Sequence, residues 1–313
     1  MKTKINTISE NDLFGCFPDK GFVYKNPAPE PNIEGVQERL DELLQLSNVT
    51  KASVVCIDVY KYSQNELRKL FVIPSVIKAI HKMTIDILIE NEAFLFEDID
   101  DPIVADTGDG LICVFPTPIH SISYIMWFEV ALRLYNTYHL SPGIREIVGK
   151  LSIRYSTSYD SIIKIEDKYY GPAIINASRM ISRDRLNRCL IDEYSIDWFT
   201  RNFNGIENII MLSKYEIQAV MRIVCPGESF SKESNLKSIF DLVVDMHWGI
   251  KACDIQHIGE LKIKETKISI YNLYIQLLAG LMKRPEYEKE DEEVKLSVSI
   301  GNSNPIGISE NFA

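Results

Sequence analysis

Apolar residues recur along the chain with two periods, one typical of amphipathic helices and one typical of strands. Helical spacing is clearest where Val76, Ile77, Ile80 and Met83 form one stripe of a long segment. Pro74 lies in that segment and predicts a break or a kink, because proline lacks a backbone donor. The predicted helices span residues 33–46, 64–92, 119–138 and 172–181.

Short apolar runs bounded by turn residues predict the strands of a sheet. Because they alternate with the helices along the chain, the pattern predicts an α/β or α+β sandwich rather than a helical bundle or a barrel. The predicted strands span residues 52–59, 94–100, 111–115, 150–160, 188–193, 259–274 (a closing pair) and 294–300.

Charge and composition narrow the classes of partner. The chain has 313 residues and a formal net charge of -10, so its field repels polyanions. We therefore expect neither broad nucleic-acid binding nor adhesion to an anionic membrane. No segment reaches the ~20 apolar residues of a spanning helix, and the first residues do not resemble a signal peptide. The six cysteines lack paired spacing, which favours reduced thiols in a cytoplasmic protein.

Two aspartates stand where predicted strands end or begin. CIDVYKYS places Asp58 at the end of one strand, and TGDG places Asp109 directly before another. If these strands are neighbours, the carboxylates lie roughly 4.8 Å apart. Two carboxylates, the Val59 carbonyl and a nucleoside triphosphate suffice to hold two divalent cations, Mn or Mg. The alternative is turn chemistry, in which an aspartate beside a glycine bonds its own backbone.

Five motifs in a fixed order extend this interpretation. IDVYKYS is followed by a long helix and then by DTGDGLICVF, IRYSTSYD, YYGPAIINASRM and GELKIKETKISIYNLY. Together they resemble the class III nucleotidyl cyclase catalytic domain over about residues 52–274. The resemblance implies an α+β fold with a ferredoxin-like (palm) sheet flanked by helices. It also implies a homodimer, because in this family the metal-binding aspartates and the base- and phosphate-binding residues come from opposite protomers.

The resemblance assigns roles to residues that spacing alone does not. Asp58 and Asp109 would bind the two metal ions, and Arg179 would contact the triphosphate as charge develops. Lys264 occupies the place of the family's last phosphate-binding lysine, with Lys262 as the neighbouring candidate. The alternative is that both lysines are solvent-exposed and prevent the edge strand from pairing with another chain.

One family position is altered. The asparagine that supports the ribose falls on Ile175, with Asn176 adjacent to it. Because one step along a helix turns a side chain by about 100°, either a local bulge brings Asn176 into place or the role is absent.

Ala105 and Lys168 occupy the two base-selecting positions of the family. Adenylate cyclases have lysine and aspartate there and guanylate cyclases typically glutamate and cysteine, so the chain matches neither purine pattern. Lys168 can donate to a pyrimidine carbonyl, and Tyr169 can pack on the base. A solvent-facing Lys168 and a Tyr169 packed on the core are the alternatives.

The chain therefore most resembles the bacterial pyrimidine cyclases of Pycsar anti-phage systems. These make cyclic UMP or cyclic CMP to switch on a separate effector protein, which need not contact the cyclase. UTP is preferred over CTP because uracil offers two carbonyl acceptors.

We expect residues 46–275 to form the cyclase domain, with an insertion near 201–246. Residues 1–45 would be an N-terminal extension with one helix, and residues 276–313 an acidic tail. Two rival functions remain open: a purine cyclase, and a cyclase-like module that binds nucleotide and regulates a partner without turnover. Ile175 favours the module, whereas the presence of both Asp58 and Asp109 favours the enzyme.

Overall fold

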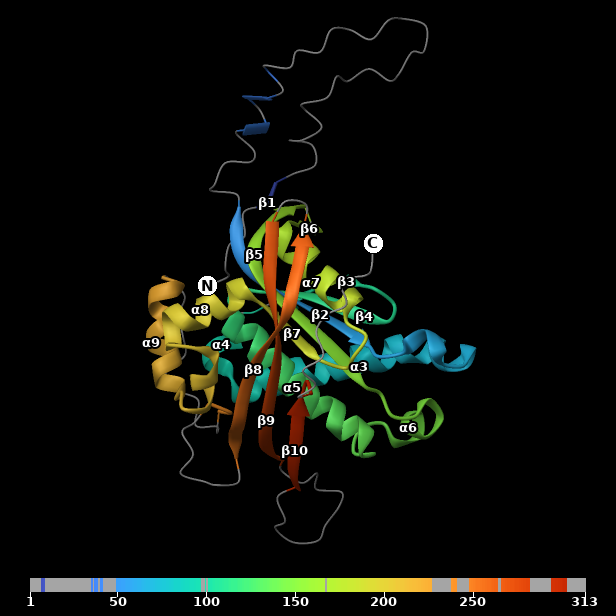
Figure 1. Ribbon diagram of the computed structural model, residues 1–313. Helices are drawn as coiled ribbons and strands as arrows, with labels where there is room; N and C mark the ends of the chain where they lie inside the picture. The colour runs from blue at the N-terminus through green and yellow to red at the C-terminus, as the bar shows by residue number, and fades with distance from the viewer. Residues whose placement is uncertain are drawn as a thin grey trace, which may run out of the picture.

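The computed structural model combines a mixed sheet with packed helices, which confirms the α+β class (Figure 1). It describes residues 7–8, 35, 37–38, 40–41, 49–96, 99, 101–166, 168–226, 238–240, 248–263, 266–281 and 294–302.

Ten strands of the described residues join one sheet. The predicted strands at 52–59, 111–115, 150–160, 188–193, 259–274 and 294–300 are confirmed, several with longer bounds. The strands are β1 (Thr7–Ile8), β2 (Thr50–Val59), β3 (Ile103–Asp106), β4 (Gly110–Phe115), β5 (Ile153–Ile165), β6 (Lys168–Tyr170), β7 (Cys189–Asp192), β8 (Gly249–Ile263), β9 (Thr266–Leu281) and β10 (Val294–Ile300).

The predicted helices at 119–138 and 172–181 are confirmed. Among the described residues, four α-helices were not predicted: α4 (Ala93–Phe96), α6 (Pro142–Val148), α8 (Glu193–Phe203) and α9 (Lys214–Val224). Of the predicted helix 33–46, the described residues 35, 37–38 and 40–41 are helical, and the others lie outside the described part of the chain. The helical segments are η1 (Tyr62–Gln64), α3 (Leu67–Asn91), α4 (Ala93–Phe96), α5 (Pro118–Asn136), α6 (Pro142–Val148), α7 (Pro172–Arg183), α8 (Glu193–Phe203), η2 (Ile206–Ile210) and α9 (Lys214–Val224).

The sheet order is β10-β9-β7-β5-β2-β4-β3, with β1 and β6 paired to β5 and with β8 paired to β9. β5 pairs antiparallel with β2 and parallel with β7. The boundary predicted at residue 275 falls within β9, and β10 pairs with the part of β9 that runs from residue 275 to residue 281. The region predicted as a tail thus adds strand to this sheet.

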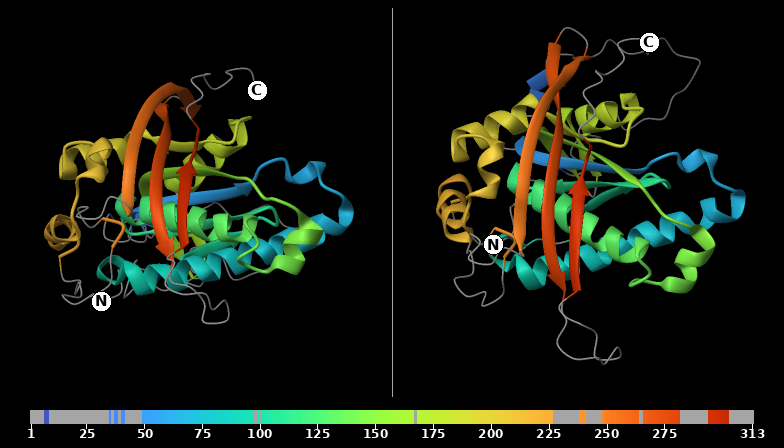
Figure 2. Two further views of the ribbon diagram at one scale, coloured as in Figure 1. Left: turned by 90° about the horizontal axis from the view of Figure 1, so that it is seen from below. Right: turned by 60° about the horizontal axis from the view of Figure 1, so that its bottom comes forward.

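Helices cover both faces of the sheet (Figure 2). α3 and α5 bury one face, where alternate residues of β2 such as Val55, Ile57 and Val59 join the main core. α7 lies on the other face, above Val54 and Cys56. Because side chains alternate along a strand, Asp58 belongs to the α7 face.

Of the break or kink predicted at Pro74, the break is wrong, because α3 runs through the proline without interruption. Proline cannot donate to the carbonyl four residues earlier, which belongs to Leu70. The Tyr62 hydroxyl donates to that carbonyl instead, at 2.8 Å. This substitute donor satisfies the carbonyl that the proline leaves unpaired.

The predicted strand at 94–100 is wrong for residues 94–96 and 99, and its other residues lie outside the described part of the chain. Residues Ala93–Phe96 form the short helix α4, and Phe94, Leu95 and Phe96 are all buried. A short apolar run buried on all sides has no period that separates helix from strand. The strand that pairs with β4 is instead β3, closer to the turn.

Part of the predicted insertion at 201–246 is helical, as η2 and α9 show. Among the described residues, no helix is both long and apolar enough to span a bilayer.

Candidate active site

The register of three neighbouring strands places the two candidate aspartates together. Asp58 on β2 stands opposite Gly110 on β4, so Asp109 lies directly beside the end of β2. The Val59 amide donates to the Asp109 carbonyl oxygen at 2.9 Å, which ties the two backbones together. On its other side Asp58 stands opposite Arg154 of β5.

The hairpin between β3 and β4 shows which aspartate makes the turn. Asp106 Oδ1 accepts from the Gly108 amide at 2.9 Å, the geometry of an Asx turn. Asp109 Oδ1 instead accepts from the Thr107 hydroxyl at 3.0 Å. The turn chemistry weighed as an alternative for Asp109 is therefore supplied by Asp106, and the Asp109 carboxylate remains half-buried beside Asp58.

The two glycines of this turn have structural causes. Gly108 has φ +84°, a conformation that side chains rarely adopt. A Cβ on Gly110 would lie 1.8 Å from the Ile57 carbonyl oxygen. Glycine at residue 110 therefore allows β4 to approach β2 closely enough to bring Asp109 to Asp58.

Asp58 is a mostly buried carboxylate, with 15% of its side chain exposed. Burial raises its pKa, the hydrogen bond and charge of Arg154 lower it, and the neighbouring Asp109 raises it again, so that the net shift is upward. Arg154 Nε donates to Asp58 Oδ2, and Arg154 Nη1 donates to the Asp184 carbonyl after α7. Ionised Asp58 is thus a destabilised charge that a further cation would stabilise.

Sequence reasoning missed Arg154. The residue stands in IRYSTSYD without a spacing that relates it to Asp58. Only the pairing of Asp58 with Arg154 across β2 and β5 reveals the contact. Knowledge of the register would have found it.

The donor set fits divalent cations of the Mg or Mn type. Among the described residues, no group of three or more His, Cys, Asp or Glu side chains could hold a metal ion. Magnesium, however, usually binds one or two carboxylates together with substrate phosphates. Asp58 and Asp109, with the Val59 carbonyl beside them, match that requirement.

Helix α7 presents different residues to solvent and to the sheet. Arg179 and Ile175 are exposed, and the Arg179 guanidinium makes no hydrogen bond or ion pair with the described residues. Asn176 is buried and its Nδ2 donates to Asp160 Oδ2 on β5 at 3.5 Å. α7 is helical throughout Pro172–Arg183, so Asn176 faces the sheet, away from Ile175.

Small side chains on β2 and β5 let α7 pack closely on the sheet. The Ser156 hydroxyl donates to the Ala177 carbonyl at 2.7 Å, and Cys56 Sγ lies 3.7 Å from Ser178 Oγ. These contacts hold α7 against the sheet at the two residues directly before Arg179.

The base-selecting candidates lie apart within one chain. Ala105 pairs with Ile112, which is level with Ser156 of β5, whereas Lys168 pairs with Ile165. Ile165 stands nine residues beyond Ser156, roughly 30 Å of extended strand. The register therefore separates Ala105 and Asp109 from Lys168.

Tyr169 and the two closing-strand lysines lie away from the aspartates or outside the described structure. The Tyr169 ring packs partly on the small core beneath α7, with Lys164 Nζ 5.3 Å from its centroid. Lys262 is exposed on β8 and pairs with Lys267 of β9. Lys264 lies outside the described residues.

Neither protein-family models nor curated proteins give a match to this chain. Among solved structures, it is similar to an adenylate/guanylate cyclase/hydrolase from Silicibacter pomeroyi, at 12% identity and a TM-score of 0.42, over 72% of this chain and 96% of that one. It is also similar to the adenylyl cyclase CyaB from P. aeruginosa, at 10% sequence identity and a TM-score of 0.41, over 77% of this chain and 98% of that one. A structure of adenylate cyclases from Trypanosoma brucei is similar to the chain at 13% sequence identity and a TM-score of 0.39, over 71% of this chain and 89% of that one. TM-scores this low carry no argument about function.

Proposed function

We propose that this chain is a nucleotidyl cyclase of the class III type, which converts a nucleoside triphosphate to its 3',5'-cyclic nucleotide and pyrophosphate. One observation carries the proposal: the pairing of β2 with β4 places Asp58 and Asp109 side by side, where burial and, to a smaller extent, the charge of Asp109 raise the pKa of Asp58. The five sequence motifs, which occur in the same order as in this family, support the proposal independently.

Asp58 and Asp109 would hold two divalent cations, with the Val59 carbonyl as a further ligand. When bound, such cations neutralise triphosphate charge and lower the pKa of a coordinated hydroxyl. Arg154 keeps the Asp58 carboxylate oriented through its hydrogen bond. The rigid β2–β4 pair fixes the separation of the two carboxylates.

In the reaction, the ribose 3'-oxygen loses its proton to solvent and forms a bond to the α-phosphorus. The bond from the α-phosphorus to the bridging oxygen breaks, and pyrophosphate leaves with that electron pair. Arg179 would stabilise the charge that develops on the phosphates, since a guanidinium fork matches phosphate oxygens. Lys262 and Lys264 are the further candidates for phosphate contacts, whereas Asn176 would have to turn away from Asp160 to contact the ribose.

The active unit we propose is a homodimer. Lys168 and Tyr169 lie roughly 30 Å along β5 from the level of Ala105 and Asp109, so one chain does not assemble the whole set. A second copy would bring its Lys168, Tyr169 and Arg179 to the aspartates of the first.

We further propose a pyrimidine substrate, UTP in preference to CTP, and a role as second-messenger synthase in anti-phage defence with a separate effector. Ala105 is exposed and has no donor for adenine, while Lys168 is exposed and carries a donor for a carbonyl oxygen. Purine cyclisation remains the closest rival.

The experiment is to incubate the purified full chain separately with UTP, CTP, ATP and GTP in the presence of Mn²⁺, and to identify products by mass spectrometry. Cyclic UMP as the main product is expected. An Asp58→Asn variant processed in parallel excludes a contaminating cyclase. A purine product would overturn the substrate assignment alone, whereas no product from any nucleotide would overturn the enzyme.

The second candidate is a module that binds nucleotide without turnover. Ile175, exposed where the resemblance expects asparagine, and the turn of Asn176 toward Asp160 favour this candidate. Nucleotide binding by the wild type, measured by calorimetry, without any cyclic product would establish it.

A further inference from the structure

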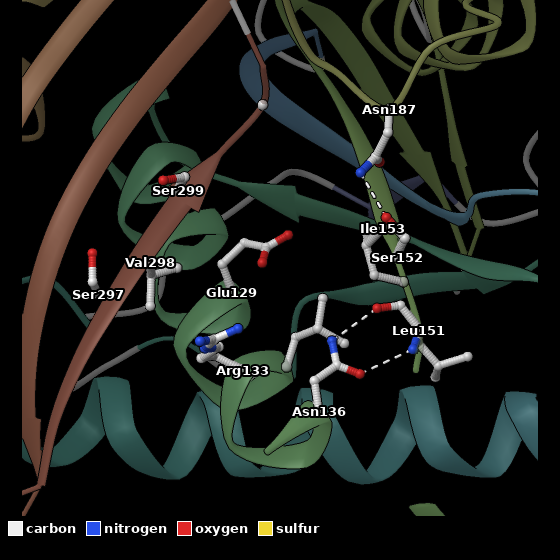
Figure 3. Close-up of a pocket in the computed structure, with 12 residues that line it drawn as sticks. Glu129, Arg133, Asn136, Leu151, Ser152, Ile153, Asn187, Ser297, Val298 and Ser299 are labelled. Carbon is white, nitrogen blue, oxygen red and sulfur yellow. Dashed lines mark hydrogen bonds between the residues drawn. The ribbon is translucent and has the colours of Figure 1, made fainter. Parts of the chain in front are cut away.

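A polar pocket of about 330 Å³ lies on the α5 face of the sheet, and neither Asp58 nor Asp109 lines it. Figure 3 shows Glu129 and Arg133 of α5 between β10 on one side and the start of β5 on the other. Its volume is at the small end of the range for ligand sites. Its lining is mainly polar, which excludes a lipid or another apolar ligand.

Two opposite charges stand on the same wall of this pocket without pairing. Glu129 and Arg133 are four residues apart on α5, so their side chains lie on one face of the helix. No ion pair joins them, and the Arg133 guanidinium has no partner among the described residues. Glu129 Oε1 accepts from the Tyr155 hydroxyl at 2.9 Å, and burial raises the pKa of Glu129 to about 7. Glu129 is therefore fully ionised only above that pH or when a cation such as an ammonium group lies against it.

Asn187 contributes an unsatisfied acceptor to the same pocket. Its Nδ2 donates to Ser152 Oγ at 2.6 Å, but its buried Oδ1 has no hydrogen-bond partner among the described residues. A buried acceptor without a partner destabilises a protein unless a ligand or water supplies a donor. Ser297 and Ser299 of β10 add hydroxyls on the opposite wall.

We propose that this pocket binds a small zwitterion of the α-amino acid class, with its carboxylate on Arg133 and its ammonium on Glu129 and Asn187 Oδ1. A simple anion would meet the Glu129 carboxylate, and a simple cation would meet the Arg133 guanidinium. A zwitterion satisfies both charges and the orphan acceptor at once.

The pocket adjoins the proposed active site through consecutive residues of β5. Ile153 lines the pocket, and Arg154 bonds Asp58 on the other face of the sheet. A ligand that orders the start of β5 would therefore affect the position of Arg154. This coupling rests on the proposed function, whereas binding itself does not.

The test is calorimetric titration of the full chain with a panel of the standard L-amino acids, together with thermal denaturation. At least one amino acid should bind with one-to-one stoichiometry and raise Tm. Arg133→Ala and Glu129→Gln should each weaken its binding by about tenfold or more, because each removes one charged hydrogen bond. Arg201→Ala, which removes an exposed arginine of α8, is the matched control and should bind normally.

The inference is overturned if no amino acid binds, or if Arg133→Ala binds as tightly as the wild type. Equal affinity for the same acid without its amino group would also contradict it, since that would show an anion site only. Asp58→Asn keeps the pocket and should bind normally. If the wild type binds an amino acid but makes no cyclic nucleotide, the proposed function fails and this inference stands.

Discussion

Two carboxylates on this sheet, the mostly buried Asp58 and the fully buried Asp192, have opposite surroundings. Asp192 is fully buried and accepts hydrogen bonds from the Ser158 hydroxyl, the Ser195 hydroxyl and the Ser195 amide. It also caps α8. Asp58 has one charged partner, Arg154, and stands beside a second carboxylate, Asp109.

The difference separates an acid that builds the fold from one that, in the proposed function, is available to a ligand. Neutral donors satisfy Asp192 completely, so a cation has no place there. Asp58 and Asp109 have unused acceptor capacity and repel each other, so a cation gains the most at that pair. The distinction that we propose between a structural and a functional carboxylate thus lies mainly in their partners, since Asp58 is itself mostly buried.

The largest effect expected is on turnover. Asp58→Asn and Asp109→Asn should each lower cyclase turnover at least ~1000-fold, because each removes a ligand of the cations. Neither should lower Tm appreciably, since the amide oxygen that Asp58→Asn introduces still accepts from Arg154. Steady-state product formation and thermal denaturation check this, with Asp106→Asn in the same turn as the matched control. Unfolding of Asp58→Asn would show that Asp58 is structural like Asp192.

Asp192→Ala should be the largest stability effect, a loss of about 3 kcal/mol in the free energy of unfolding. The variant strands the donors of Ser158 and Ser195 and removes the cap of α8. Urea denaturation of wild type and variant measures the difference. If Asp192→Ala lowers the free energy of unfolding no more than Asp58→Ala does, the proposed difference between the two acids is wrong.

Asp192 should also leave a signature in the pH dependence of stability. Burial raises its pKa to about 6 in the folded state, so its stabilisation is full at low pH and falls as pH rises through about 6. The wild type should lose on the order of 2 kcal/mol between pH 4 and 7 relative to Asp192→Asn. Denaturation at several pH values tests this, and parallel curves for the two proteins would contradict it.

Arg154→Met should give the smallest effect, about 1 kcal/mol of lost stability without divalent cations, because Asp58 then lacks its positive partner. Added Mn²⁺ should restore part of that loss in Arg154→Met. It should restore nothing in the double variant with Asp58→Asn. Thermal denaturation with and without Mn²⁺ checks both statements. A Mn²⁺ effect of the same size in the double variant would place the cation elsewhere.

The sequence predicts what depends on local pattern and motif order. Asp58 and Asp109 stand at the ends of apolar runs, and their strands prove to be neighbours. Arg154 escapes prediction because its contact depends on strand register, which no local pattern reveals. The same applies to Pro74, whose lost hydrogen bond is replaced by Tyr62 from outside the helix.

The sequence also fails to predict the structure of short buried segments and the orientation of single side chains. The run at residues 94–96 has no period that separates helix from strand, and its burial decides the outcome. Asn176 cannot be placed from spacing alone, because one helical step decides whether it faces Asp160 or solvent. The pocket around Glu129 joins α5, β5 and β10, segments far apart in the sequence.

Direct measurement of Mn²⁺ binding tests the central claim, that Asp58 and Asp109 hold cations together with a triphosphate. Electron paramagnetic resonance of the full chain can follow free Mn²⁺ in the presence of 3'-deoxy-UTP, which cannot cyclise. We predict binding by the wild type and Asp192→Asn, and at least about tenfold weaker binding by Asp58→Asn and Asp109→Asn. Equal Mn²⁺ affinity in wild type and Asp58→Asn would contradict the account.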